Sequence, residues 1–110
     1  MAKTIRFTFN DIDYTLEYTK RTIKQMEANG FDINEIDSKQ MTMLEMMFAG
    51  SFLAHHRFTK VDTINEIYKA MPSKEELLEA LSEMYREQID SLLEEPDENV
   101  TKKVEWSKDF

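Results

Sequence analysis

The sequence predicts a mainly α, α+β fold in which an N-terminal β-hairpin packs on a bundle of about four helices. Two patterns and the chain length predict it. Apolar and polar side chains alternate over residues 3–18, and apolar residues then recur at helical spacing to residue 95. A chain of 110 residues has room for one modest core. We therefore expect a single domain over residues 1–95 and a polar, acidic, mobile tail over residues 96–110.

The hairpin is predicted from an alternation of strand-forming residues. Its apolar side chains fall on one face: Ile5, Phe7, Phe9, Ile12, Tyr14, Leu16 and Tyr18. Asn10 and Asp11 interrupt the alternation, and both side chains tolerate the left-handed backbone of a tight turn. A two-residue loop would pair Phe9 with Ile12, and a longer loop would pair Phe9 with Tyr14. Either way the apolar face stays intact, and it must pack on helices because a lone hairpin is marginally stable in water.

Two helices are predicted after the hairpin. Thr19 can cap the first, which ends at Gly30, because glycine suits the left-handed position after a helix end. Ser38 is expected to open the second helix, from Met41 to about Arg57. This helix is apolar on almost every side, so it lies at the centre of the core or leaves part of its surface for a partner. Residues that follow helical spacing on one side of it are Met41, Leu44, Phe48, Phe52 and His55.

Two further helices complete the predicted bundle. The third starts at Thr59 or Asp62 and ends before Pro72. The sequence from Ser73 to Glu76 is typical of a capping box, which would start the fourth helix. The apolar side of the fourth helix carries Leu77, Leu78, Leu81, Met84, Tyr85, Ile89, Leu92 and Leu93. Its other side is acidic, and we expect the row Glu75, Glu79, Glu83 and Glu87 to be solvated.

The charge balance limits the partners. The chain has 22 acidic and 14 basic residues and a net charge of −8, which repels phosphate backbones and anionic membrane surfaces. We expect no nucleic acid and no membrane as partners. The longest apolar stretch, Met41–Ala54, is shorter than the roughly 18 residues of a membrane span. Cysteine is absent, which excludes disulfides and thiolate chemistry, and a cytoplasmic protein is the simplest interpretation.

No catalytic or metal-binding constellation is evident in the sequence. His55 and His56 are the only histidines. Neighbouring residues on a helix point about 100° apart, so the two side chains do not easily coordinate one metal ion. Glycine occurs only at Gly30 and Gly50, which rules out a glycine-rich phosphate loop. No serine stands in a nucleophile motif. We therefore expect no enzyme, no metal ion and no cofactor.

Methionine is frequent in the second helix and suits two roles. It fills irregular gaps in a core, and it also adapts an apolar surface to varied partners. If the surface role holds, the candidate protein-binding residues are Met43, Met46, Met47, Phe52 and Leu53, with Trp106 as an anchor in the tail. An alternative for Trp106 is docking, together with Val104, on the protein's own hairpin.

Four segments, in their order along the chain, resemble a known family. They are Phe7–Tyr18, Lys24–Asp32, Phe48–Phe58 and Tyr68–Leu77. In this order they resemble the phage tail assembly chaperones, small proteins of long-tailed phages and prophages of Gram-positive bacteria. The resemblance covers residues 4–95 and lies in packing and capping residues, so it carries over no binding residues.

The resemblance implies a non-catalytic protein of the bacterial host cytoplasm. Such a chaperone binds the long, aggregation-prone tape-measure protein, keeps it soluble and helps to recruit tail-tube protein. Members often also exist in a longer form made by ribosomal frameshifting. A homo-oligomer is compatible with the sequence. The alternative function is a small acidic phage-encoded regulatory or inhibitor protein that binds a host protein through its acidic helix, an interaction that added salt would weaken.

Overall fold

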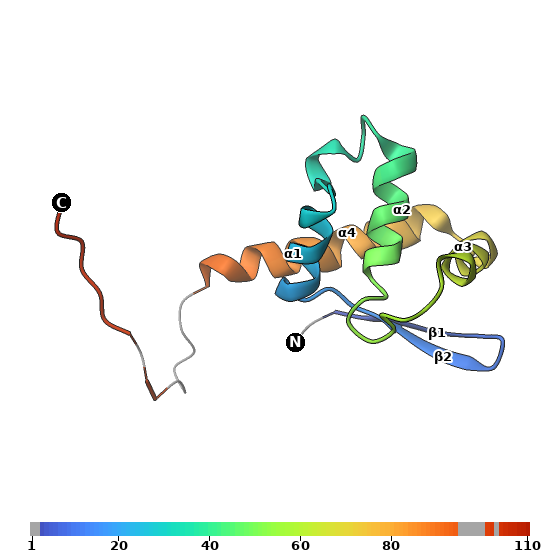
Figure 1. The fold of residues 1–110 in the computed structure, drawn as a ribbon, viewed down its shortest axis with the longest axis horizontal. Helices are drawn as coiled ribbons and strands as arrows, with labels where there is room; N and C mark the ends of the chain where they lie inside the picture. Colours follow the sequence, from blue (N-terminus) through green and yellow to red (C-terminus); the bar gives the residue numbers. More distant parts are fainter. Residues whose placement is uncertain (1–2, 95–100, 103) are drawn as a thin grey trace.

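The structure is a computed structural model that describes residues 3–94, 101–102 and 104–110. Its elements are β1 (Ile5–Phe9), β2 (Ile12–Leu16), α1 (Lys20–Ala28), the short 3-10 helix η1 (Ile33–Glu35), α2 (Gln40–Gly50), α3 (Val61–Ala70), α4 (Lys74–Asp90) and the 3-10 helix η2 (Ser91–Leu93). A two-stranded antiparallel hairpin followed by four helices confirms the predicted fold class. Figure 1 shows α1 and α2 side by side across α4.

The predicted tail is described only in part. Residues 104–110 have no regular secondary structure and are exposed. Residues 95–100 and 103, which belong to the predicted boundary and tail, lie outside the described residues. The predicted domain can therefore be compared with the structure over residues 3–94.

The hairpin closes through the shorter of the two predicted loops. Asn10 and Asp11 have φ angles of 50° and 64°, and Phe9 pairs with Ile12. Positive φ at both central residues is what a tight hairpin turn requires. Leu16 is fully buried, whereas Ile12 beside the turn is 53% exposed. The apolar face is therefore buried at the end nearest the helices and not at its tip.

The hydrophobic core lies where the hairpin meets the four helices, α1 to α4. Tyr85 of α4 is its aromatic centre, since its ring lies edge-on to Tyr18 and Phe31 with ring centroids 5.6 and 5.3 Å apart. Burial of one large apolar side chain contributes about 1.5–3 kcal/mol. The other fully buried apolar side chains are Leu16, Met47, Phe48, Phe52 and Ile67.

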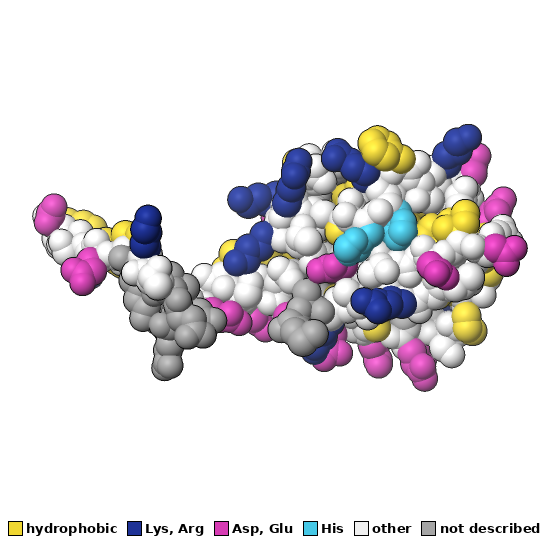
Figure 2. All heavy atoms as spheres, turned by 90° about the horizontal axis from the view of Figure 1, so that it is seen from below, with side chains coloured by type: hydrophobic (Ala, Val, Ile, Leu, Met, Phe, Trp, Pro, Cys, Tyr) yellow, Lys and Arg dark blue, Asp and Glu magenta, His cyan; other side chains and the backbone are white. Residues whose placement is uncertain are grey.

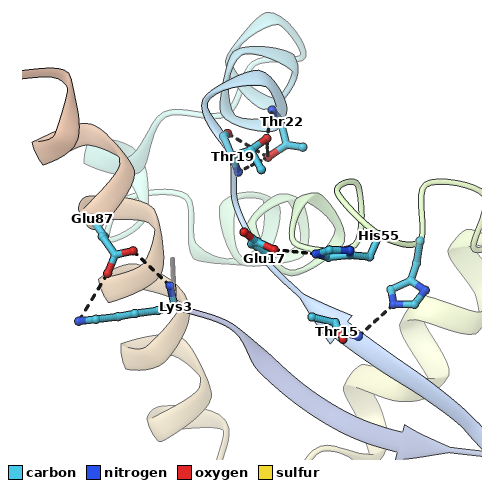
Figure 3. A network of polar contacts seen from close by, with 8 residues as sticks. Lys3, Thr15, Glu17, Thr19, Thr22, His55 and Glu87 are labelled. Carbon is cyan, nitrogen blue, oxygen red and sulfur yellow. Dashed lines mark hydrogen bonds and ion pairs between the residues drawn. The ribbon is translucent and has the colours of Figure 1, made fainter. Parts of the chain in front are cut away.

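Helix α1 begins and ends as its sequence predicts. The Thr19 hydroxyl accepts from the Thr22 N–H at 3.1 Å, and the Thr22 hydroxyl accepts from the Thr19 N–H at 2.9 Å (Figure 3). These bonds satisfy backbone donors that a helix start leaves free. At the other end Gly30 has a φ of 101°, and the Phe31 N–H donates to the Met26 carbonyl at 3.0 Å. This is the bonding pattern of a glycine-terminated helix.

Helix α2 is shorter than predicted. It ends at Gly50 and is followed by turns over residues 51–55, so the predicted continuation to about Arg57 is wrong. The cause is a tertiary contact. The Ser51 carbonyl accepts a hydrogen bond from the Glu17 N–H at 3.0 Å, which holds the chain beside the end of β2 instead of in a further helical turn.

Neighbouring residues decide both ends of α2. Ser38 does not cap the helix as predicted, because its hydroxyl donates to the Glu35 carbonyl at 3.2 Å, and Lys39 occupies the cap position. At the other end Gly50 lies against Met26 of α1, where an added Cβ would come 2.5 Å from the sulfur atom. Glycine costs a helix roughly 0.5–1 kcal/mol, but here it lets α1 and α2 approach closely.

The break between α3 and α4 falls where predicted, but the predicted cap does not form. Helix α3 ends at Ala70, shortly before Pro72. Ser73 has a left-handed backbone with φ 54°, and its side chain makes no capping bond, so the predicted capping box is wrong. An N-cap side chain reaches the helix amides from an extended backbone, and Ser73 does not have that geometry.

Only the first part of the apolar side of α4 is buried. The buried residues of this helix are Leu77, Leu81, Met84 and Tyr85. Farther along, Ile89, Leu92 and Leu93 are 40%, 62% and 90% exposed, and this end extends past α1 and α2 in Figure 1. The final apolar residues of the predicted stripe therefore belong to the surface.

Candidate functional site

An apolar groove between α2 and α3 is the strongest candidate for a binding site. Its volume is about 670 Å³. The apolar side chains of longest reach that line it are Met41, Leu44, Met46 and Phe48 from α2, and Val61, Ile64 and Tyr68 from α3. On each helix three of them follow the i, i+3, i+7 spacing of one helix face. Two apolar stripes therefore line the groove, one from each helix.

The groove combines a packed floor with exposed walls. Phe48 and Ile64 are 2% and 9% exposed, and the Phe48 ring lies edge-on to Tyr68 with centroids 5.1 Å apart. Met41 and Val61 are 84% and 70% exposed. Exposed apolar side chains gathered around a hollow are typical of interaction sites. The groove therefore offers a ligand apolar contacts that the fold itself does not use.

The candidate residues from the sequence are divided between core and surface. Met43, Met47 and Phe52 are 4%, 0% and 1% exposed, so they contact no partner while the core stays closed. Met46 is half-buried and lines the groove. Leu53 is half-buried in the turns after α2 and is not among the groove residues.

Trp106 stands apart from the other candidates. It lies in the described part of the C-terminal segment and is 82% exposed, and its neighbour Val104 is 85% exposed. In this conformation it is not docked on the hairpin. The structure therefore brings Met46 alone of the six candidates into the groove.

Of the seven apolar side chains of longest reach in the groove, only Met46 was a candidate binding residue from the sequence. The other six are Met41, Leu44, Phe48, Val61, Ile64 and Tyr68. Met41 and Leu44 were expected on the same side of the second helix as Phe48, and all three do lie on one side. That side lines the groove. A usable signal was present in the sequence. The same i, i+3, i+7 spacing occurs in two successive helices. Each of these stripes begins with a residue that the core does not bury, Met41 in α2 and Val61 in α3.

A second hollow runs along α4 and is acidic. Its volume is about 760 Å³. The lining includes the carboxylates of Asp37, Glu79, Glu83, Glu87, Asp90 and Glu94 and the apolar residues Ile33, Ile36 and Leu78. Three of the four glutamates of the predicted row line it, and Glu75 does not.

Lys3 reduces the negative charge of this hollow. Its ammonium group pairs with Glu83. It also lies 3.9 Å from Glu87, and the backbone N–H of Lys3 donates to Glu87 at 3.1 Å (Figure 3). The hydrogen bond to Glu83 raises the pKa of Lys3 and lowers the pKa of the Glu83 carboxyl. These groups are solvated, so the pair positions the start of the chain more than it stabilises the fold.

The two histidines make structural contacts of different kinds. His55 Nε2 lies 2.6 Å from Glu17 Oε1, and His56 Nε2 accepts from the Thr15 N–H at 2.9 Å. Figure 2 shows both on one face of the molecule, close to each other. Among the residues that the structure describes, no group of three His, Cys, Asp or Glu side chains could hold a metal ion.

The whole chain matches a family model. The family is described as a domain of unknown function (DUF5055), and the match spans residues 1–110. The chain belongs to this family. No curated protein and no solved structure matches it. Membership of DUF5055 thus assigns neither an activity nor a ligand. Within the described part of this DUF5055 chain, no helix has the length and apolar character needed to cross a membrane.

Proposed function

We propose that this DUF5055 chain is a non-catalytic phage tail assembly chaperone that binds an apolar helix of the tape-measure protein between α2 and α3. The observation that carries the proposal is the pair of apolar stripes around a floor formed by Phe48 and Ile64. An amphipathic helix binds such a groove through side chains at i, i+3 or i+4, and i+7. Because the stripes follow the same spacing, a helix is the client that suits them.

Methionine makes the walls of the groove adaptable. Met41 and Met46 line it, and an unbranched thioether side chain repacks around ligands of different shape. A chaperone that covers many stretches of one long client needs such tolerance, since no two stretches present the same side chains. The exposed Met41 can move without disturbing the floor.

Charge supports the solubilising role. The chain has a net charge of −8, and the exposed side of α4 carries much of the excess. Acidic proteins that coat one client repel one another and keep the assembly soluble. The rim of the groove, with Glu45 and Lys69, adds polar groups around the apolar contact.

The identity of the client is supported by the resemblance of four sequence segments to tail assembly chaperones. The proposal therefore has two parts of different origin: the groove supports binding of an apolar helix, and the resemblance supports the tape-measure protein as its source. Recruitment of tail-tube protein in the host cytoplasm belongs to the second part.

Co-expression with the tape-measure protein from the same genome tests the proposal. We expect the unaltered chain to keep more of that protein soluble than the variants Val61→Asp and Met41→Asp, which place a charge on a groove wall. Phe58→Asp is the matched control, because Phe58 is 90% exposed and does not line the groove. Equal solubility with and without the unaltered chain contradicts the chaperone role. An equal loss of tape-measure protein solubility with all three variants contradicts the groove as the binding site.

The acidic hollow along α4 favours a second candidate function, that of a small regulatory or inhibitor protein that binds a basic surface of a host protein. Salt separates the two functions. Binding through Glu79 and Glu83 weakens as salt is added, whereas binding in the apolar groove does not. A binding titration at low and high salt, repeated with Glu79→Gln, distinguishes them.

A further inference from the structure

The two edges of the hairpin differ in their backbone contacts. A two-residue turn makes the residues that flank it a hydrogen-bonded pair, so on each strand every second residue directs its N–H and C=O away from the partner strand. Beyond the turn on the β2 side, these include Thr15 and Glu17, whose N–H groups donate to His56 and to the Ser51 carbonyl. The outer edge of β2 is therefore covered by the connection after α2.

The outer edge of β1 has no such cover. Its outward-directed residues are Arg6 and Thr8, and among the described residues no backbone hydrogen bond beyond those of the hairpin involves either of them. The strand contains no proline, and Arg6 is its only charged residue. Proteins usually protect exposed edges because these edges pair with other strands. The edge of β1 is thus available to a further strand.

The structure shows the chain's own C-terminal segment, residues 104–110, exposed and not docked. We infer that in solution this segment docks on the open edge of β1 as a third strand. This inference is independent of the proposed function. In an extended chain the even-numbered residues share one face, which carries the apolar Val104, Trp106 and Phe110. Lys108 stands on this face between Trp106 and Phe110. The other face is polar and carries Glu105, Ser107 and Asp109. Valine and aromatic residues favour strands. The three apolar side chains are 85%, 82% and 101% exposed, so docking would remove a large apolar area from water.

The surface of β1 is complementary to this segment. Its helix-facing residues are half-buried, which leaves part of each for a neighbouring strand to cover: Ile5, Phe7 and Phe9. Trp106 placed beside Phe7 would bury both aromatic rings further. On the opposite face, Arg6 would lie next to Glu105, and the two charges are opposite.

The segment is close enough to reach this edge. The N–H of Lys3 donates to Glu87 at 3.1 Å, so the start of β1 lies against α4 (Figure 3). From Glu87 to Glu94 the chain advances roughly 10 Å along the helix axis. From Glu94 to Val104 an extended chain spans up to roughly 33 Å. The segment therefore reaches the Ile5 end of β1 first, which places it parallel to that strand.

Chain connection favours the segment's own domain over a second copy. A short linker holds a tethered segment at an effective concentration on the order of millimolar. A second copy at micromolar concentration competes poorly against it. Docking is therefore expected within one chain.

Trp106 is the only tryptophan, so its fluorescence reports on docking directly. In the intact chain we expect emission at shorter wavelength and weaker quenching by acrylamide than in the urea-unfolded chain. Thr8→Pro removes the outward N–H of β1, whereas Thr8→Ala keeps it. We expect Thr8→Pro to shift the emission to that of an exposed tryptophan and Thr8→Ala to leave it unchanged. An intact chain that already emits as exposed tryptophan overturns the inference.

Amide hydrogen exchange gives a readout that does not depend on the folding of the proline variant. We expect the N–H groups of Arg6 and Thr8 to exchange at least about 10-fold faster in Trp106→Ser than in the intact chain. Phe7, whose N–H bonds within the hairpin, is the internal control and should not change. Equal exchange at Arg6 and Thr8 in both proteins overturns the inference. Protection that appears only as protein concentration rises assigns the docked segment to a second copy and overturns it as well.

Discussion

His56 Nε2 accepts a hydrogen bond from the Thr15 N–H at 2.9 Å, and this bond ties β2 to the connection between α2 and α3. Only an unprotonated ring nitrogen can accept it. Burial, and after it the neighbouring His55, lower the pKa of His56 below the ordinary value of 6.5. The tether is therefore sensitive to pH.

Stability should decrease as the pH falls below 6.5, the ordinary pKa of histidine. Below that value the unfolded chain binds a proton at His56 and the folded protein does not, so the free energy of unfolding falls until the lower pKa of the folded state is reached. Above pH 6.5 the contribution is complete. Urea unfolding between about pH 7.5 and 5.5 measures this effect. His56→Gln keeps an acceptor without a titrating group and should show a smaller slope; identical slopes would contradict the prediction.

Tyr18→Phe should cost about 1 kcal/mol of unfolding free energy. The buried Tyr18 hydroxyl donates to the Met47 carbonyl at 2.5 Å, and burial raises the pKa of this tyrosine well above 10.0. The loss is moderate because the Ser51 N–H also donates to that carbonyl, at 3.3 Å. Chemical denaturation measures the loss. Tyr14→Phe is the matched control, since the Tyr14 hydroxyl has no hydrogen bond within the described residues. If both variants lose the same unfolding free energy, the Tyr18 hydrogen bond makes no specific contribution to stability.

Thr19→Ala should destabilise the protein by about 1 kcal/mol, because it removes the side chain that caps α1. Ser73→Ala is the comparison, since Ser73 occupies the cap position of α4 without a capping bond. Its effect should lie within about 0.5 kcal/mol. Thermal or urea unfolding of the two variants measures the difference. A larger loss at Ser73 than at Thr19 would contradict the assignment of the caps.

Met47→Ala and Met41→Ala should separate core from groove. Met47 is fully buried, and its truncation should cost about 2–5 kcal/mol. Met41 is 84% exposed, and its truncation should change the unfolding free energy by no more than about 0.5 kcal/mol. Urea unfolding measures both. Similar losses would mean that Met41 belongs to the core.

Features fixed by neighbouring residues were predictable from the sequence. The turn at Asn10 and Asp11, the cap at Thr19 and the helix end at Gly30 depend on the backbone preferences of those residues, and each lies where it was predicted. The end of α3 before Pro72 has the same origin. The fold class followed because period-two and helical patterns are both long enough to be distinguished.

Features fixed by contacts between distant residues were not predictable in the same way. The end of α2 depends on a hydrogen bond from Glu17, far earlier in the chain, to Ser51. The groove depends on which face α3 turns toward α2, and helical spacing alone does not distinguish a stripe that lines a groove, such as that of Val61, from one that fills a core. Ser73 matched a capping motif, but its left-handed backbone excludes the bond.

The contact between Gly50 and Met26 links two distant positions of the chain. A Cβ at position 50 would overlap the end of the Met26 side chain, so a larger residue there requires that this flexible side chain shifts or that a smaller one replaces it. The two positions should therefore covary among DUF5055 sequences. Members without glycine in the last turn of α2 should carry a compact residue in α1.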